Sequence, residues 1–275
     1  MHLSGIKGYF RAVLSDPVSR EQPKTGNAKP PGSWWGGTPT GYAAIIVFRM
    51  KRVVVSWSSG KDSAWTLHLL RQRGDCDIVA LLTTVNAQFD RVAMHGTRRS
   101  VLEAQARAAG LPLWIVPLPW PCSNENYEQR MREVCARALS EGVEAIAFGD
   151  LFLQDVRAYR EKQLQPTGLE TLFPLWQQPT AALAQEMIAN GLRAKLSCID
   201  TKRLPQAFAG RDFNGSLLAE LPPGIDPCGE YGEFHTCVYA GPMFQSPIRL
   251  EPGEVVTRDG FTYADFAARL DDNQD

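Results

Sequence analysis

The residues with the clearest chemical potential lie in one short segment, Ser-Ser-Gly-Lys-Asp-Ser, which runs from Ser58 to Ser63. The segment follows the β-branched run Val53–Val55, which predicts a buried strand, and it leads into a predicted helix over 62–73. Small residues let the backbone approach an anion closely, and the N-terminal end of a helix directs N–H groups and a positive dipole at the same place. Lys61 adds a positive charge. The segment therefore predicts a loop that binds phosphate.

The spacing of this loop differs from G-x-x-x-x-G-K-[ST], because too few residues precede Lys61 to wrap a β-phosphate. The segment instead resembles the Ser-Gly-Gly-Lys-Asp-Ser loop of the ATP pyrophosphatases, the PP-loop superfamily, which cleave ATP between the α- and β-phosphates and transfer AMP to a substrate oxygen. Ser59 stands where that loop has its first glycine, and serine adopts a positive φ less readily. The alternative interpretation is an ordinary strand, polar turn and capped helix.

A second cluster of chemical groups, Gly-Glu-Tyr-Gly-Glu-Phe-His, spans Gly229 to His235. Its glycines let the backbone approach a ligand, while Glu230 and Glu233 could bind a metal or move protons. His235 titrates near neutral pH. The alternative is a solvated turn that leads into a strand over 234–239.

The elements that position these groups alternate between strand and helix after Arg52, which predicts an α/β fold with a doubly wound parallel sheet. The predicted strands are 53–57, 77–84, 113–117 and 143–148, and the predicted helices are 62–73, 97–109 and 124–140. Glycines 74, 110 and 142 end these helices. Ligands of such sheets bind at the carboxyl ends of the strands. We therefore expect the 58–63 loop, the segment after Thr84 and Gly149-Asp150 to share one crevice.

The chain divides into four predicted parts. Residues 1–49 are rich in Pro and Gly, and predict a disordered or mis-started extension, because Met50 directly precedes the first strand. Residues 50–165 form the predicted ATP-binding domain. Residues 166–248, with a helix over 180–190 and a strand over 194–199, form a smaller α+β acceptor-binding domain. Residues 249–275 are predicted to form a hairpin that turns at Asp259-Gly260, a short helix from Tyr263 and a tail.

Composition narrows the partners of the protein. With 29 basic and 30 acidic residues the net charge is −1, which argues against binding to nucleic acid or to an anionic membrane surface. The apolar runs are far shorter than the ~20 residues of a membrane helix. Six cysteines without a C-x-x-C pair indicate reduced thiols in a cytoplasmic protein and argue against a structural zinc site. The sequence is compatible with a homodimer.

Several motifs occur in the order that is seen in the diphthine:ammonia ligase family, and the resemblance covers roughly residues 52 to 248. They are the 58–63 loop, Gly149-Asp150 with Arg157 and Glu161 after it, Pro174-Leu175-Trp176, and the segment 229–236. The resemblance implies an adenine-nucleotide α-hydrolase fold, with a C-terminal domain whose glycine and glutamate residues face the ATP site. Tyr231 replaces a glycine of the family motif and His235 replaces a glutamate, so the acceptor need not be diphthine.

The resemblance implies an ATP-dependent ligase that adenylates a carboxylate, small or protein-borne, and forms an amide with ammonia. Backbone N–H groups of the 58–63 loop, Lys61 and Mg²⁺ would stabilise the charge that builds on the α-phosphate and on departing pyrophosphate. Asp62 is the first candidate magnesium ligand and Asp150 the second. Alternatively, Asp62 is only a first-turn acid that the helix dipole favours. Ser58 and Ser63 would hydrogen-bond phosphate oxygens or merely cap the helix.

The remaining candidates are less specific. Arg157 suits a phosphate or an acceptor carboxylate, or it forms a surface pair with Glu161. Asn86 and His95 are weaker candidates for contact with adenine or ribose. The predicted catalytic residues are Lys61, Asp62, Glu230, Glu233 and His235. The predicted nucleotide-binding residues are Ser58, Ser59, Gly60, Lys61, Asp62, Ser63, Gly149, Asp150 and Arg157.

Two other functions are compatible with a PP-loop. A tRNA-thiolating enzyme would need a sulfur-carrying cysteine or cluster and a basic RNA groove, and the cysteine spacing and near-neutral charge argue against both. A nucleotide sensor would bind ATP or AMP without turnover. The release of pyrophosphate separates the ligase from the sensor.

Overall fold

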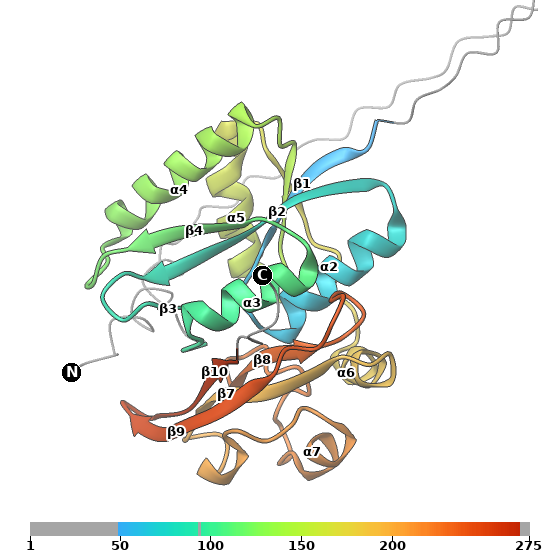
Figure 1. The fold of residues 1–275 in the computed structure, drawn as a ribbon, viewed down its shortest axis with the longest axis vertical. Helices are drawn as coiled ribbons and strands as arrows, with labels where there is room; N and C mark the ends of the chain where they lie inside the picture. The colour runs from blue at the N-terminus through green and yellow to red at the C-terminus, as the bar shows by residue number, and fades with distance from the viewer. Residues whose placement is uncertain (1–48, 93–94, 270–275) are drawn as a thin grey trace, which may run out of the picture.

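A computed structural model describes residues 49–92 and 95–269 of the 275-residue chain. The predictions for an N-terminal extension and a C-terminal tail therefore fall almost entirely outside the described residues. The described chain forms two sheets that pack together through the helices between them (Figure 1). In the described ranges no helix is both long enough and apolar enough to cross a membrane.

The first sheet is built around strand β1 (Lys51–Ser56), which pairs in parallel with β2 (Cys76–Asn86) on one side and with β5 on the other. Its outer parallel strands are β4 (Leu113–Leu118), which pairs with β2, and β6 (Glu170–Leu172), which pairs with β5 (Ala145–Ala147). A short β3 (Arg91–Val92) pairs antiparallel with the end of β2. The central position of β1 places the loop after it in the middle of the carboxyl edge, and the α/β prediction is confirmed.

Helices cover both faces of this sheet because its central strands are apolar on both sides. Val53 and Val55 belong to one core, together with residues of α2 (Lys61–Arg73) and α3 (Arg99–Ala109). Val54 belongs to the other core, with residues of α4 (Asn124–Ser140) and α5 (Gln154–Leu164). The predicted glycine caps of α2 and α3 are confirmed, since Gly74 and Gly110 adopt the left-handed conformation, at φ 67° and 65°.

The second sheet is antiparallel, in the order β8-β7-β10-β9. Its strands are β7 (Arg193–Asp200), β8 (Phe234–Ala240), β9 (Leu250–Arg258) and β10 (Phe261–Ala268). Helices α6 (Thr180–Ala189) and α7 (Gly215–Glu220) accompany it, with a short 3₁₀ turn at Gln206–Phe208. Another 3₁₀ turn, Gln165–Thr167, lies between α5 and β6 of the first sheet.

The last part of the second sheet corrects one prediction. The hairpin turn at Asp259-Gly260 is confirmed, but the short helix expected from Tyr263 is wrong, because this segment is strand β10. Thr262, Ala264 and Phe266 are buried and alternate with less buried neighbours, which is the period of a strand. β10 also pairs with β7, so the hairpin is an integral part of the second sheet.

The two sheets share a continuous core. Leu67 of α2, Leu196 of β7 and Phe234 of β8 are buried in the same apolar cluster. Figure 1 shows the second sheet beneath α2 and α3. This packing brings β8 and the residues before it against the loop that follows β1, although more than 160 residues separate them in the sequence.

Candidate active site

The loop after β1 has a special backbone conformation at Ser59, with φ at 73°. Residues other than glycine adopt this left-handed region of φ and ψ only at a cost in conformational energy. The Ser59 side chain is fully buried and its Oγ lies 2.7 Å from Oγ1 of Thr97, which compensates part of that cost. Ser59, which stands where the resembling motif has a glycine, therefore adopts the left-handed conformation that glycine favours.

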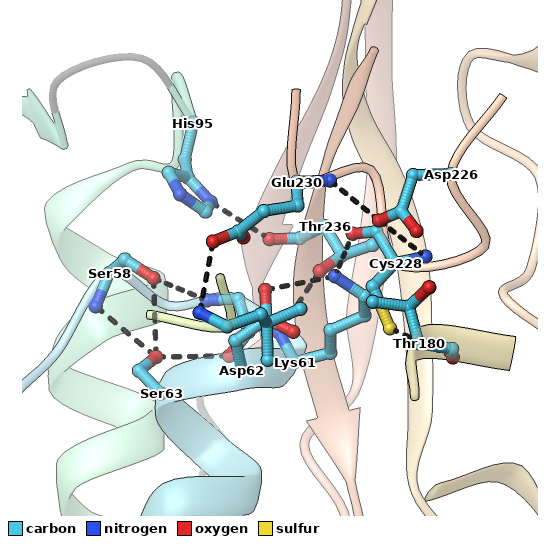
Figure 2. Close-up of polar contacts among 12 residues, drawn as sticks. Ser58, Lys61, Asp62, Ser63, His95, Thr180, Asp226, Cys228, Glu230 and Thr236 are labelled. Atoms are coloured by element: carbon cyan, nitrogen blue, oxygen red, sulfur yellow. Dashed lines mark hydrogen bonds and ion pairs between the residues drawn. The ribbon is translucent and has the colours of Figure 1, made fainter. Parts of the chain in front are cut away.

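The hydroxyls of Ser58 and Ser63 close the loop on itself (Figure 2). Ser63 Oγ donates to Gly60 O at 3.0 Å and lies 3.2 Å from Ser58 Oγ, while Ser58 N approaches Ser63 Oγ at 3.3 Å. These contacts order the turn. Ser63 lies in the first turn of α2, and Ser58 lies just before this helix.

Two glycines permit close packing around this loop. A Cβ on Gly60 would lie 2.8 Å from Cε1 of His95, and a Cβ on Gly149 would lie 2.8 Å from the carbonyl carbon of Asp62. Real Cβ atoms essentially never approach other atoms so closely. The segment after β5 therefore lies directly against the first turn of α2, as expected of a shared crevice.

Strand β8 of the second sheet also holds the loop. Val238 N donates to Ser59 O at 3.0 Å, and Lys61 N donates to Thr236 Oγ1 at 3.0 Å. Gln105 of α3 is fully buried, and its Nε2 donates to Ser59 O at 3.1 Å and to Val238 O at 2.7 Å. Sequence reasoning missed Gln105, whose only signal is its position one turn after Val101 on the buried face of α3.

Lys61 and Asp62 form an ion pair at 2.9 Å, in which the lysine is buried and the aspartate side chain is 26% exposed. The Lys61 side chain is 2% exposed, and its Nζ also donates to the backbone oxygen of Cys228. Burial lowers the pKa of Lys61, but the Asp62 carboxylate and further negative groups outweigh this and raise the pKa above its ordinary value. Burial raises the pKa of Asp62 and the Lys61 ammonium opposes that rise. Asp62 Oδ1 is buried and has no hydrogen-bond partner among the described residues.

Glu230 and Glu233 have different environments. Glu230 accepts a hydrogen bond from Leu151 N at 2.9 Å, and burial, assisted by the charge of Asp62, raises its pKa to about 7. Glu233 is fully buried, and its Oε1 accepts from Arg203 Nη1 at 2.9 Å and from Asp226 N at 3.3 Å. Glu230 therefore contacts Leu151 and is affected by the charges of Asp62 and Lys61. Glu233 instead pairs with Arg203.

The arginines after β5 are engaged with neighbouring side chains. Arg160 donates from Nε to Asp150 Oδ2 at 2.5 Å and from Nη2 to Oδ1 at 3.2 Å. Arg157 donates to Glu161 at 2.7 Å, which is the surface pair that the sequence leaves open. The Arg157 guanidinium also lies 4.7 Å from the ring centroids of both Phe173 and Trp176. Sequence reasoning missed Arg160.

A cavity of about 240 Å³ opens at the carboxyl ends of β1, β2 and β5. Ser58, His95 and His235 line it, together with residues of α4 and α5 that include Tyr127 and Tyr159. No motif had indicated the two tyrosines, because they come from the interior of helices. Their rings, with Phe148, offer the kind of apolar surface that binds a planar base.

The two histidines of the cavity lie side by side, with ring centroids 4.6 Å apart and ring planes tilted by 41°. His95 Nδ1 lies 3.1 Å from Thr236 O, so this nitrogen must carry the proton, because a carbonyl oxygen only accepts. Burial lowers the pKa of His95 to about 4. Asn86 Oδ1 accepts hydrogen bonds from Gln88 N and Phe89 N in the turn after β2.

The residues fit a magnesium ion only in part. The described residues contain no group of three or more His, Cys, Asp or Glu that could hold a metal alone. Mg²⁺ needs only one or two carboxylates where phosphate oxygens supply further ligands. Asp62 fits this role, because its buried Oδ1 has no hydrogen-bond partner in the part of the chain that the structure describes. Asp150 fits it less well, because both of its oxygens accept hydrogen bonds from Arg160.

The fold and the loop define the class of the protein. A Ser-Ser-Gly-Lys-Asp-Ser turn at the centre of a doubly wound sheet, beside a cavity at the strand ends, is the arrangement of a PP-loop α/β protein. Residues 50–171 match the diphthamide synthase N-terminal domain, and residues 179–265 match the diphthamide synthase C-terminal domain. The chain belongs to the diphthamide synthase family.

Curated relatives agree with this assignment. The chain is 26% identical over 238 residues to a diphthine–ammonia ligase of Bos taurus and 25% identical over 238 residues to that of Homo sapiens, in both cases covering 78% of this chain and 89% of the relative. A diphthine–ammonia ligase of Schizosaccharomyces pombe is 26% identical over 218 residues, which are 72% of this chain and 36% of that protein. These matches confirm the expected class, an ATP-dependent amide-forming ligase.

Proposed function

We propose that this protein activates a carboxylate by transfer of AMP from ATP and then forms an amide with ammonia, at a site between the 58–63 loop and Glu230. The proposal rests on the surroundings of the Glu230 carboxylate. Glu230 comes from the segment before β8, its carboxylate bonds the amide of Leu151 just after Gly149-Asp150, and the charges of Asp62 and Lys61 act on it. Three separate motifs of the chain thus meet at one carboxylate.

In this proposal the adenosine part of ATP occupies the cavity, and the α-phosphate lies at the start of α2. The amides of the loop and the helix dipole stabilise the negative charge there. Asp62 would hold the magnesium ion, and this ion would neutralise negative charge on the phosphates. His95 remains neutral near pH 7, so it adds no charge next to the nucleotide.

Glu230 is the proposed proton acceptor for the amine. A pKa of about 7 lets it be ionised in a large part of the molecules at neutral pH and still gain a proton during the reaction. Its bond to Leu151 N directs one oxygen, Oε1, to the backbone. The other carboxylate oxygen is then the one that takes the proton from the attacking nitrogen.

The acceptor is proposed only as a carboxylate. The relatives are named for diphthine and ammonia, and ammonia is carried over here as the amine donor. Tyr231, which replaces a glycine of the family motif, is 59% exposed beside Glu230, and its ring lies 5.2 Å from that of Phe152. This ring adds bulk beside Glu230. The carboxylate substrate can therefore differ from diphthine.

The test is release of AMP and pyrophosphate from magnesium-ATP, with ammonium and a panel of carboxylates that includes diphthine on a protein. We expect Asp62→Asn to lose at least about 100-fold in rate, because metal and phosphate positioning supply several kcal/mol. The matched control is Asp155→Asn, an exposed first-turn acid of α5. Formation of ADP would contradict the proposed bond cleavage, and tight binding of ATP without any turnover would indicate a sensor.

A further inference from the structure

We propose that Lys61 is a positioning residue, which holds the glycine–glutamate loop (residues 226–233) against the first turn of α2 and does not bind a phosphate of the nucleotide. Its role in catalysis rests on the proposed function above, whereas its role in positioning the loop can be tested without any nucleotide. The proposal replaces the sequence-based interpretation of Lys61 as a phosphate ligand.

The position of the Lys61 side chain carries the proposal. The side chain is 2% exposed and is not among the residues that line the cavity. Its Nζ donates to Cys228 O and pairs with Asp62 Oδ2 at 2.9 Å, and it lies 5.8 Å and 5.5 Å from the ring centroids of Phe213 and Phe234. Figure 2 shows Lys61 at the junction between α2 and the loop.

These contacts satisfy a buried ammonium group. An unpaired charge inside a protein is costly, so a buried lysine needs an anion, hydrogen-bond acceptors or aromatic faces around it. Lys61 has all three in its present position. Moving the group to a phosphate would break the bond to Cys228 O and leave that buried carbonyl without its ammonium donor.

The bond to Cys228 also determines where Glu230 lies. Asp226 Oδ2 accepts from Cys228 N at 3.2 Å and from Glu230 N at 2.9 Å, so one carboxylate holds both residues. Lys61 therefore acts on the proposed proton acceptor through Cys228 and Asp226. The backbone of Lys61 contributes independently, through its bond to Thr236 Oγ1.

The first test is amide hydrogen exchange of the full chain without nucleotide. Lys61→Met keeps most of the apolar stem and removes the ammonium, so we expect amides of residues 226–233 to exchange about tenfold faster, as loss of a charged hydrogen bond implies. Lys162→Met, at an exposed lysine of α5, is the matched control and should leave these rates unchanged. Unchanged loop exchange in a folded Lys61→Met protein would overturn the proposal.

A second test uses the unmodified protein and does not depend on how the variant folds. Reductive methylation followed by mass spectrometry should label Lys61 at least about tenfold more slowly than Lys162, both with and without ATP, because Lys61 is sealed from solvent. A phosphate ligand would behave differently. Rapid labelling of Lys61 that ATP suppresses would overturn the proposal.

A third measurement separates this proposal from the proposed function. For Lys61→Met we expect the Kd of a non-hydrolysable ATP analogue to be unchanged, and kcat for pyrophosphate release to fall about tenfold or more. A Kd weakened tenfold together with unchanged loop exchange would show that Lys61 binds phosphate. If the unmodified protein binds no ATP, the proposed function fails, while the exchange and labelling experiments still decide the role of Lys61.

Discussion

Gly149 lies directly against the backbone of Asp62. A Cβ on Gly149 would be 2.8 Å from the carbonyl carbon of Asp62, 2.9 Å from its carbonyl oxygen and 2.9 Å from the amide nitrogen of Ser63. All three atoms belong to the backbone, so none can move aside as a flexible side chain would. Because Gly149 has no side chain, the segment that follows β5 can pack directly against the first turn of α2 beside the candidate active site.

This contact predicts a cost for Gly149→Ala. We expect the free energy of unfolding to fall by about 1–3 kcal/mol, the usual range for overpacking, and the affinity for ATP to fall as well because α2 shifts. Urea unfolding and calorimetry would measure the two effects. Gly215→Ala is the control, since a Cβ there meets no atom of the described residues within 4 Å and its φ is not positive. Equal stability of the two variants would contradict the packing argument.

Ser59 allows a second test of the loop. Ser59→Ala and Ser59→Gly both remove the 2.7 Å contact with Thr97, but only glycine relieves the left-handed backbone at φ 73°. We therefore expect Ser59→Gly to be more stable than Ser59→Ala by about 1 kcal/mol in chemical denaturation. An alanine variant as stable as the glycine variant would mean that the strain at this residue is negligible.

The ion pairs of Asp265 predict a pH dependence of stability. Burial raises the pKa of Asp265, but Arg98 and Arg91 outweigh it and lower the pKa to about 2. Because the folded pKa is below the unfolded value of 3.8, the stabilisation is complete above about pH 4 and is lost as the pH falls towards 2. It amounts to about 2 kcal/mol at neutral pH.

We therefore expect Asp265→Asn to lower the unfolding free energy by about 2 kcal/mol at pH 7 and by clearly less at pH 3. Urea unfolding at the two pH values measures the difference, with Asp155→Asn as an exposed control. Added salt should reduce the effect, since the two arginines are 34% and 47% exposed. A loss that is the same at both pH values would assign the effect to packing.

Glu230 predicts the pH dependence of the reaction. Its raised pKa, about 7, means that the ionised form is lost as the pH falls below neutrality, so the rate should decrease there. We expect Glu230→Gln to lower kcat by about 100-fold and to remove this part of the pH profile. Glu186→Gln, at an exposed residue of α6, should change neither. An unchanged profile in Glu230→Gln would assign the ionisation near pH 7 to another group.

The elements of the first sheet could be predicted because their signals are local. Val53–Val55 is apolar at every position, as a strand covered on both faces must be, and Gly74 and Gly110 end helices where a left-handed residue is required. The segment from Tyr263 was predicted wrongly because it is short and rich in alanine. Pairing with β7 and β9 decides its conformation, and neither strand is visible from the segment itself.

The sequence by itself determined the tight turn at residues 58–63, the alternation of strands and helices and the presence of a carboxylate-rich turn, because each depends on residues within a few positions of one another. Only the tertiary structure decided what each side chain does. Lys61 meets Cys228, which is 167 residues away, and Gln105 meets Val238, which is 133 residues away. Burial between the two sheets selects these partners, since a buried ammonium or amide must find acceptors wherever the chain brings them. The fold therefore separates Lys61, which faces the second sheet, from the hydroxyls of Ser58 and Ser63 beside it.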